Sequence, residues 1–98
     1  MKASLLAKFA ALSERYREVG HLLGEPDVIA DQTRFRTLSQ EYAELEPVVK
    51  TYASYCHVVA SIEEARLLAK DADPELRELA QDEIKSGESA RLELEQEL

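Results

Sequence analysis

The side chains best suited to nucleophilic, acid–base or metal chemistry in this sequence are His21, Cys56 and His57. His21 lies where we expect the first helix to end, and the helix dipole favours an imidazolium there, so we interpret it as a surface or capping residue. Cys56 and His57 are neighbours, whose side chains on a helix point about 100° apart. A zinc site would need a further Cys or His three or four residues away, and there is none. We therefore expect a buried cysteine beside a half-exposed histidine, and we assign no catalytic, metal-binding or cofactor-binding residue.

The sequence also lacks clear motifs for the recognition of phosphates or nucleic-acid bases. The three glycines stand singly, at positions 20, 24 and 87, so there is neither a GxGxxG nor a Walker pattern. Aromatic rings can serve as platforms for bases, but on an acidic protein we interpret them as amphipathic core residues. The tyrosines concerned are Tyr16, Tyr42, Tyr52 and Tyr55.

The net charge of the chain also argues against nucleic-acid binding. Its formal net charge is −8, and an acidic surface repels phosphate, so direct nucleic-acid binding is disfavoured and basic protein partners fit better. Residues 71–98 hold ten of the twenty acidic residues and only three basic ones. A single cysteine cannot form an internal disulfide, and no apolar run approaches the roughly 20 residues that span a bilayer. We expect a cytoplasmic protein with no membrane partner.

The elements that carry these residues are predicted to be helices in one domain, residues 1–98, because strand-like alternation is nowhere sustained. The first helix is expected over residues 3–23 or 4–23. Its apolar positions recur every three or four residues, which requires a helical partner packed nearly antiparallel. They are Leu5, Phe9, Leu12, Tyr16, Val19 and Leu23.

The turn after this helix contains residues that typically end one helix and begin the next. Gly24 is expected to adopt a left-handed conformation, which ends many helices at low steric cost when glycine provides it. Pro26 cannot donate a hydrogen bond to continue the helix. Asp31 is a suitable N-cap for the next helix, since its carboxylate can accept hydrogen bonds from free amides of the first turn.

A second, long helix is expected over residues 31–71. Its apolar stripe is interpreted as a buried packing face, so Phe35→Ala should cost roughly 3–5 kcal/mol if that side chain is fully buried. Pro47 costs a helix interior about 3 kcal/mol and either kinks it or starts a new helix; no loop-like sequence surrounds it, so we favour one long kinked helix. The stripe comprises Phe35, Leu38, Tyr42, Leu45, Val49, Tyr52, Cys56, Val59, Ile62, Ala65 and then Leu68 or Ala69.

A third helix is expected from residue 74 towards the end of the chain. Asp73 is a natural N-cap, Pro74 suits the first helical position, and Gly87 weakens the middle. The fold class is thus all-α, an elongated antiparallel helical hairpin with a third packed helix, and the ending EQEL suggests a longer helix. The apolar positions of the third helix are Leu76, Leu79, Ala80, Ile84, Leu94 and Leu98.

Several of these segments together resemble the N-terminal helical domain of the bacterial peptide chain release factor 1 family, which reads the stop codons UAA and UAG. The resemblance rests on the strings LLG, IADQ-x-RFR-x-LS and EYAEL at their spacings, and on DADPELRELAQDEI later in the chain. The sister factor that reads UGA does not have this N-terminus. The resemblance covers essentially all 98 residues.

This resemblance implies a binding and positioning domain of a longer factor and no enzymatic activity in the chain itself. The Gly-Gly-Gln motif that promotes peptidyl-tRNA hydrolysis and the Pro-x-Thr motif that reads the codon are both missing, so stop codon and peptidyl-tRNA would be contacted only through other domains. The implied partners are ribosomal stalk-base proteins near the GTPase-associated region, and release factor 3. Arg34 and Arg36 are the candidate positive contacts, and the acidic third helix suits a basic neighbour.

A stand-alone helical adaptor or coiled-coil dimerisation module is the alternative. The apolar stripes predict it equally well, because a heptad pattern does not say whether its partner helix lies in the same chain.

Overall fold

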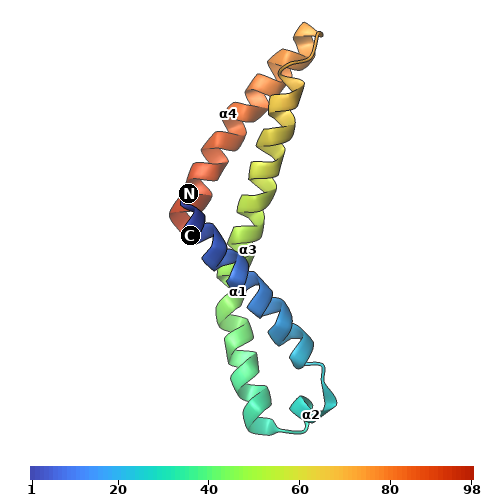
Figure 1. The fold of residues 1–98 in the computed structure, drawn as a ribbon, viewed down its shortest axis with the longest axis vertical. Helices are drawn as coiled ribbons and strands as arrows, with labels where there is room; N and C mark the ends of the chain where they lie inside the picture. The colour runs from blue at the N-terminus through green and yellow to red at the C-terminus, as the bar shows by residue number, and fades with distance from the viewer. The chain divides into compact units, whose positions relative to one another are not determined.

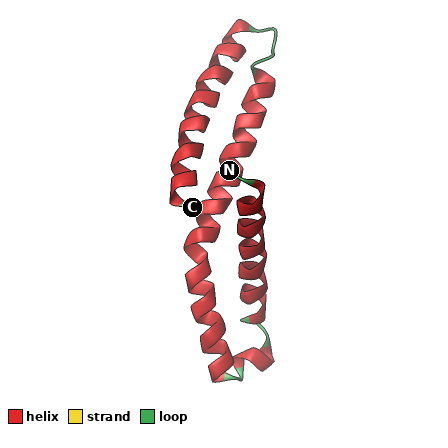
Figure 2. Ribbon diagram, turned by 60° about the vertical axis from the view of Figure 1, so that its left-hand side comes forward, coloured by secondary structure: helices red, strands yellow, loops and turns green.

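The computed structural model describes residues 1–98, and all of its regular structure is helical (Figures 1 and 2). The elements are α1 (Ala3–Leu22), α2 (Pro26–Ile29), α3 (Gln32–Leu68) and α4 (Pro74–Glu97). The predicted all-α class is confirmed. Pro47 lies inside α3, so the expectation of one long helix through this residue is confirmed, while the kink stays a prediction.

The chain divides into two compact units, which we call the first unit (Met1–Lys50) and the second unit (Thr51–Leu98). In the first unit α1 and the beginning of α3 run antiparallel (Figure 1), because Val19 clusters with Leu38, whereas Tyr16, earlier in α1, stacks on Tyr42, later in α3. In the second unit the end of α3 runs antiparallel to α4, and the chain turns between them at residues 69–73 (Figure 1). The expectation that residues 1–98 form a single domain stays a prediction.

The short helix α2 was not predicted, and it changes the account of the turn. No glycine has a positive φ, so the left-handed conformation expected at Gly24 is wrong. Instead Leu23 keeps a right-handed conformation, and the amide of Gly24 donates to the carbonyl of His21 at 3.0 Å. The chain then starts α2 at Pro26, whose fixed φ suits a first helical position.

The core of the first unit explains why α2 exists. Val19 of α1, Val28 of α2 and Leu38 of α3 form one buried cluster, and the two valines are completely inaccessible. Burial of such side chains contributes roughly 1.5–3 kcal/mol each. One turn of helix between α1 and α3 therefore closes the core with an apolar residue. Partly buried side chains pack around the cluster: Leu22, Leu23 and Tyr42.

The start of α3 confirms one expectation and corrects another. The Oδ1 atom of Asp31 accepts from the amide of Arg34 at 3.1 Å, so the predicted N-cap is confirmed. Phe35, however, is 39% exposed and not buried as expected. At 100° per residue it lies about 60° around the helix from Leu38, which occupies the core, so Phe35 falls at the edge of the packing face.

Further along α3 the predicted stripe is confirmed at Ile62 and Ala65, which are buried, and wrong at one position. Tyr55 is buried and Cys56 is exposed, so the expected burial of Cys56 is wrong. The buried positions 55, 62 and 65 follow spacings of seven and three, which place them on one helical face. Cys56 lies about 100° away from that face, on the solvent side.

The beginning of α4 was predicted correctly, and its packing face only in part, since Ala80 is buried as expected. The Oδ1 atom of Asp73 accepts from the amide of Glu75 at 2.9 Å, and Pro74 occupies the first helical position. Leu76 and Leu79, expected to be apolar packing positions, are exposed, whereas Ala80 is buried. The helices pack through small residues here, so the larger leucines are left on the outside.

Gly87 shows how close that packing is. A Cβ atom at this position would lie 2.6 Å from Cγ1 of Ile62 on α3. At the glycine that was expected only to weaken α4, Ile62 of α3 thus leaves no room for a side chain. Seven residues separate Gly87 from Ala80, which places both on the same face of α4.

Candidate interaction site

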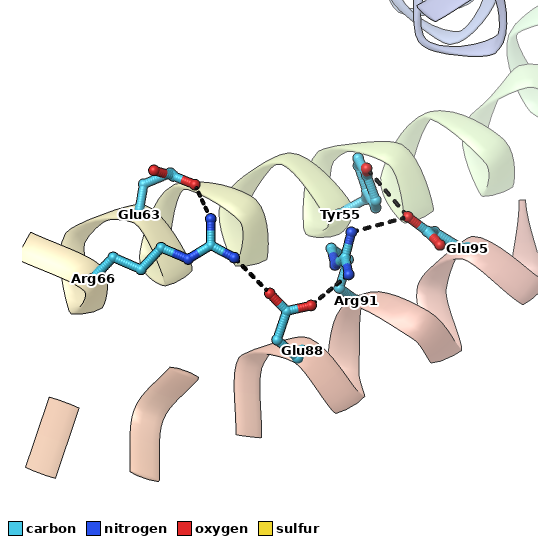
Figure 3. Close-up of polar contacts among 6 residues, drawn as sticks. All are labelled: Tyr55, Glu63, Arg66, Glu88, Arg91 and Glu95. Carbon is cyan, nitrogen blue, oxygen red and sulfur yellow. Dashed lines mark hydrogen bonds and ion pairs between the residues drawn. The ribbon is translucent and has the colours of Figure 1, made fainter. Parts of the chain in front are cut away.

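The second unit contains a network of alternating charges between α3 and α4 (Figure 3). The carboxylate of Glu88 accepts from both Arg66, at 3.0 Å, and Arg91. Arg91 also pairs with Glu95 at 3.7 Å, and the hydroxyl of Tyr55 donates to the same Glu95 carboxylate at 3.4 Å. The full network is Tyr55, Glu63 and Arg66 of α3 with Glu88, Arg91 and Glu95 of α4.

Contacts within this network shift the pKa values of two of its members, Arg91 and Tyr55. The hydrogen bond to the Glu88 carboxylate raises the pKa of Arg91 above its ordinary value, against the opposing effect of desolvation. Burial, and then the nearby Glu95, raises the pKa of Tyr55. A cationic arginine and a neutral phenol are therefore held far from the neutral range that general acid–base catalysis uses. The arrangement suits a clamp between two helices.

A hollow open to solvent lies beside this network and is balanced in charge. The carboxylates of Glu63 and Glu88 and the guanidinium groups of Arg66 and Arg91 line it. The Nε atom of Arg91 is buried there without a hydrogen-bond partner. With equal numbers of opposite charges already paired, the hollow offers no strong attraction to an ion of either sign. Its other lining residues are Tyr55, Val59 and Ile62.

In the first unit an ion pair joins α1 directly to α3. Arg15 binds Glu41 through two hydrogen bonds, Nε to Oε2 at 2.6 Å and Nη2 to Oε1 at 2.7 Å. Next to this pair the rings of Tyr16 and Tyr42 stack, with centroids 4.2 Å apart and planes 12° from parallel. A side-chain hydrogen bond with Tyr42, followed by desolvation, raises the pKa of Tyr16 to about 12. These two rings stack on each other, as expected of core residues.

The residues first singled out for chemistry are all on the surface. His21 has a side chain 80% exposed and lies 3.1 Å from Glu25, with which it forms an ion pair when protonated. Cys56 and His57 are both exposed. No group of three or more His, Cys, Asp or Glu side chains is placed to hold a metal ion. The surface position expected for His21 is confirmed, and a half-exposed His57 is corrected to an exposed one.

The two candidate positive contacts differ from each other. Arg34 pairs with Asp27 of α2 at 3.6 Å, whereas Arg36 forms no ion pair. Arg36 lines a shallow hollow at the junction of α2 and α3, together with two exposed apolar side chains, Ile29 and Phe35. This hollow was not predicted from the sequence. A signal for it was present, because Ile29 is a large apolar residue that belongs to none of the predicted packing stripes, as expected of an exposed apolar site.

The acidic side chains of α4 form an exposed face. Glu75, Glu78, Asp82 and Glu83 are all exposed and form no ion pair, and by helical spacing they surround Leu79. Residues 51–98 carry twelve acidic and five basic side chains, against eight and seven in residues 1–50. None of the four helices combines the length and the apolar character that a bilayer span requires.

Most of the sequence matches the model of a known protein family. A family model described as the PCRF domain matches residues 12–98, which begin in α1 and include all of α2, α3 and α4. The match therefore includes most of the first unit and all of the second. No solved structure matches the chain.

Proposed function

The chain belongs to the PCRF domain family, which is associated with the release factors of translation termination, and from this we propose that it is the N-terminal helical domain of a bacterial release factor that reads UAA and UAG. The family match over residues 12–98 carries the proposal. The stretch IADQTRFRTLS, which caps and opens α3, carries the finer assignment to release factor 1.

The role of this domain is binding and positioning. The chain has no two adjacent glycines and no proline followed two residues later by threonine, so it holds neither the hydrolytic motif nor the codon-reading motif of these factors. Contacts with the stop codon and with peptidyl-tRNA belong to other domains of the factor. The domain works in the cytoplasm, on the ribosome.

The partner that fits the exposed acidic face of α4 is a basic protein at the ribosomal stalk base, near the GTPase-associated region. Four carboxylates without ion pairs attract basic residues, and the exposed Leu79 between them supplies apolar contact area. Communication with release factor 3 takes place from the same position. Arg34 is held by Asp27, which leaves Arg36 as the better cation for a second contact.

The stop-codon assignment is tested with the full-length factor in a peptide-release assay on ribosomes programmed with UAA, UAG or UGA. We expect release at UAA and UAG only. Deletion of residues 1–98 should leave some codon-dependent release and impair the response to release factor 3. Release at UGA contradicts the assignment to release factor 1, and complete loss of release by a folded truncation contradicts a purely positioning role.

The acidic face is tested by charge reversal in the same factor. The double variant Glu78→Lys and Asp82→Lys should weaken ribosome binding, because basic neighbours are then repelled. The matched control is Glu44→Lys with Glu64→Lys, two exposed glutamates without ion pairs outside this face. Equal effects of the two double variants would show that only net charge matters.

The alternative is a stand-alone adaptor or coiled-coil dimerisation module. Sedimentation velocity of the chain itself distinguishes it from the proposed function by measuring the oligomeric state. Strong self-association with little folded monomer would favour the adaptor. We expect a folded monomer, since the apolar stripe of α1 already contributes Val19 to an intramolecular core.

A further inference from the structure

We propose that the hollow at the junction of α2 and α3, which we call the Phe35 hollow, docks an α-helix of another protein that carries an apolar anchor next to a carboxylate. The hollow lies wholly in the first unit, whereas the acidic face of α4 belongs to the second. The proposal does not depend on the termination role. The lining residues are Ile29, Gln32, Phe35, Arg36 and Ser39.

The apolar part of the Phe35 hollow consists of two large side chains that the fold leaves uncovered. Ile29 is 55% exposed and Phe35 is 39% exposed. They come from different helices, α2 and α3, and yet line the same hollow. Val28, next to Ile29, is completely buried, so α2 presents one apolar residue to the core and another to the surface.

The spacing of the α3 residues matches the requirements of a helical ligand. Positions 32, 35, 36 and 39 are separated by three, one and three residues, so they form a continuous row along one side of the helix. Leu38 points to the core from the neighbouring side. A second helix laid along such a row inserts its side chains at matching intervals, which is how amphipathic helices bind grooves.

The charge in the hollow selects the chemistry of that helix. Arg36 forms no ion pair, while the nearby Arg34 is paired with Asp27 and Asp31 caps α3. A single free guanidinium beside apolar surface is complementary to one carboxylate, with which it can form two parallel hydrogen bonds. Nucleic-acid backbones need several cations to release their counterions, so a protein ligand is favoured over RNA.

The test uses the isotopically labelled 98-residue chain and two synthetic amphipathic helical peptides, followed by NMR. One peptide places glutamates beside a leucine face, and the other has lysines at the glutamate positions. We expect the glutamate peptide to shift the amides of Ile29, Phe35 and Arg36. In the Arg36→Glu variant the preference should reverse towards the lysine peptide, with each charge pairing altering affinity by about fivefold.

Matched variants distinguish binding at the Phe35 hollow from non-specific binding to exposed apolar side chains. Phe35→Ala should weaken binding by about tenfold or more, as loss of an aromatic anchor does. Leu67→Ala removes a leucine that is 71% exposed in the second unit and should have no effect. Arg36→Glu and Leu67→Ala alter exposed side chains only, so both are expected to fold, as the dispersion of their spectra will report.

Three results would overturn the proposal. In the first, neither peptide shifts the amides that line the hollow. In the second, the glutamate peptide keeps its preference in Arg36→Glu. In the third, a single-stranded RNA oligonucleotide shifts the same amides at lower concentration than the peptide, which would reassign the hollow to a base stacked on Phe35.

Discussion

Each unit packs two antiparallel helical segments against each other, and the two units do so with different kinds of side chain. In the first unit the two antiparallel segments are held by a dry cluster of Val19, Val28 and Leu38. In the second unit two of the buried residues are alanines, Ala65 and Ala80, and a network of charges links α3 to α4. The first unit is nearly balanced in charge, whereas the second has seven more acidic than basic residues. An antiparallel helix pair can therefore be stabilised without concentrating its apolar side chains, provided that small residues allow close approach.

The largest expected effect lies in the core of the first unit. Leu38→Ala should reduce the free energy of unfolding by about 2–4 kcal/mol, because it leaves a cavity among buried aliphatic side chains. Phe35→Ala, on the same helix, should cost about 1 kcal/mol or less, because that side chain is partly exposed. Urea unfolding followed by circular dichroism measures both. Equal losses would show that Phe35 is as important to the core as the original stripe implied.

In the second unit the substitution expected to have the clearest effect on stability is at Gly87. Gly87→Ala adds a Cβ that collides with Ile62, whose branched side chain is stiff, at a cost of roughly 1–3 kcal/mol. The gain in helix propensity, about 1 kcal/mol, offsets part of this, so we expect a net loss of about 1 kcal/mol. Thermal unfolding gives the difference.

The control for Gly87 is Gly24→Ala. Gly24 has no positive φ, and a Cβ there would meet only the carbonyl of His21 at an ordinary 3.4 Å. Loss of unfolded-state freedom should then stabilise the chain by about 0.5 kcal/mol. Opposite signs for the two glycines support close packing at position 87, and stabilisation by both substitutions would argue against it.

A smaller effect is expected from the charged network. Glu88→Gln removes the negative charge shared by Arg66 and Arg91, and we expect a loss of about 1 kcal/mol or less, because all three side chains retain solvent contact. Glu64→Gln, at an exposed position without an ion pair, should be neutral. The difference between the two variants should shrink in 1 M salt, which screens charges beyond about 3 Å. A difference that salt leaves unchanged would point to hydrogen bonding and not to charge.

The smallest expected effect is the pH dependence of the first unit. The hydrogen bond from Arg15 lowers the pKa of Glu41 below its ordinary value of 4.5. The ionised carboxylate therefore stabilises the folded chain above pH 4.5, and this contribution is lost as the pH falls through the lowered folded-state pKa. Glu41→Gln should show a flatter decline of melting temperature below pH 4.5 than the unchanged chain. Parallel curves for the two proteins would contradict the pKa shift.

The features that could be predicted from the sequence are the local ones. Asp31 and the Asp73-Pro74 pair mark helix starts through bonds to residues two or three positions away, and the structure has both caps. Pro47 was also placed correctly inside a continuous α3. These signals need no knowledge of the rest of the fold.

The features that were missed depend on distant partners or on small phase differences. At 3.6 residues per turn the step from Leu38 to Cys56 is five whole turns, so helical spacing alone places Cys56 on the buried face. The burial of Tyr55 instead depends on contacts with α4, which this spacing does not reveal. The four residues of α2 are too few to show periodicity. The link from Arg66 to Glu88 joins residues 22 positions apart and was not readable from spacing, whereas the pair of Glu88 and Arg91, three positions apart, could have been recognised.

The close approach of Gly87 to Ile62 constrains how this sequence can diverge. A side chain at position 87 is disfavoured while position 62 keeps a branched residue, because the first added carbon lies 2.6 Å from Cγ1. A smaller residue at position 62, such as alanine, removes that atom and opens position 87 to substitution. Each change alone is destabilising, because Ile62→Ala leaves a cavity at a buried position and Gly87→Ala overlaps with Ile62, whereas each change reduces the cost of the other. Positions 62 and 87 should accordingly vary together among related sequences.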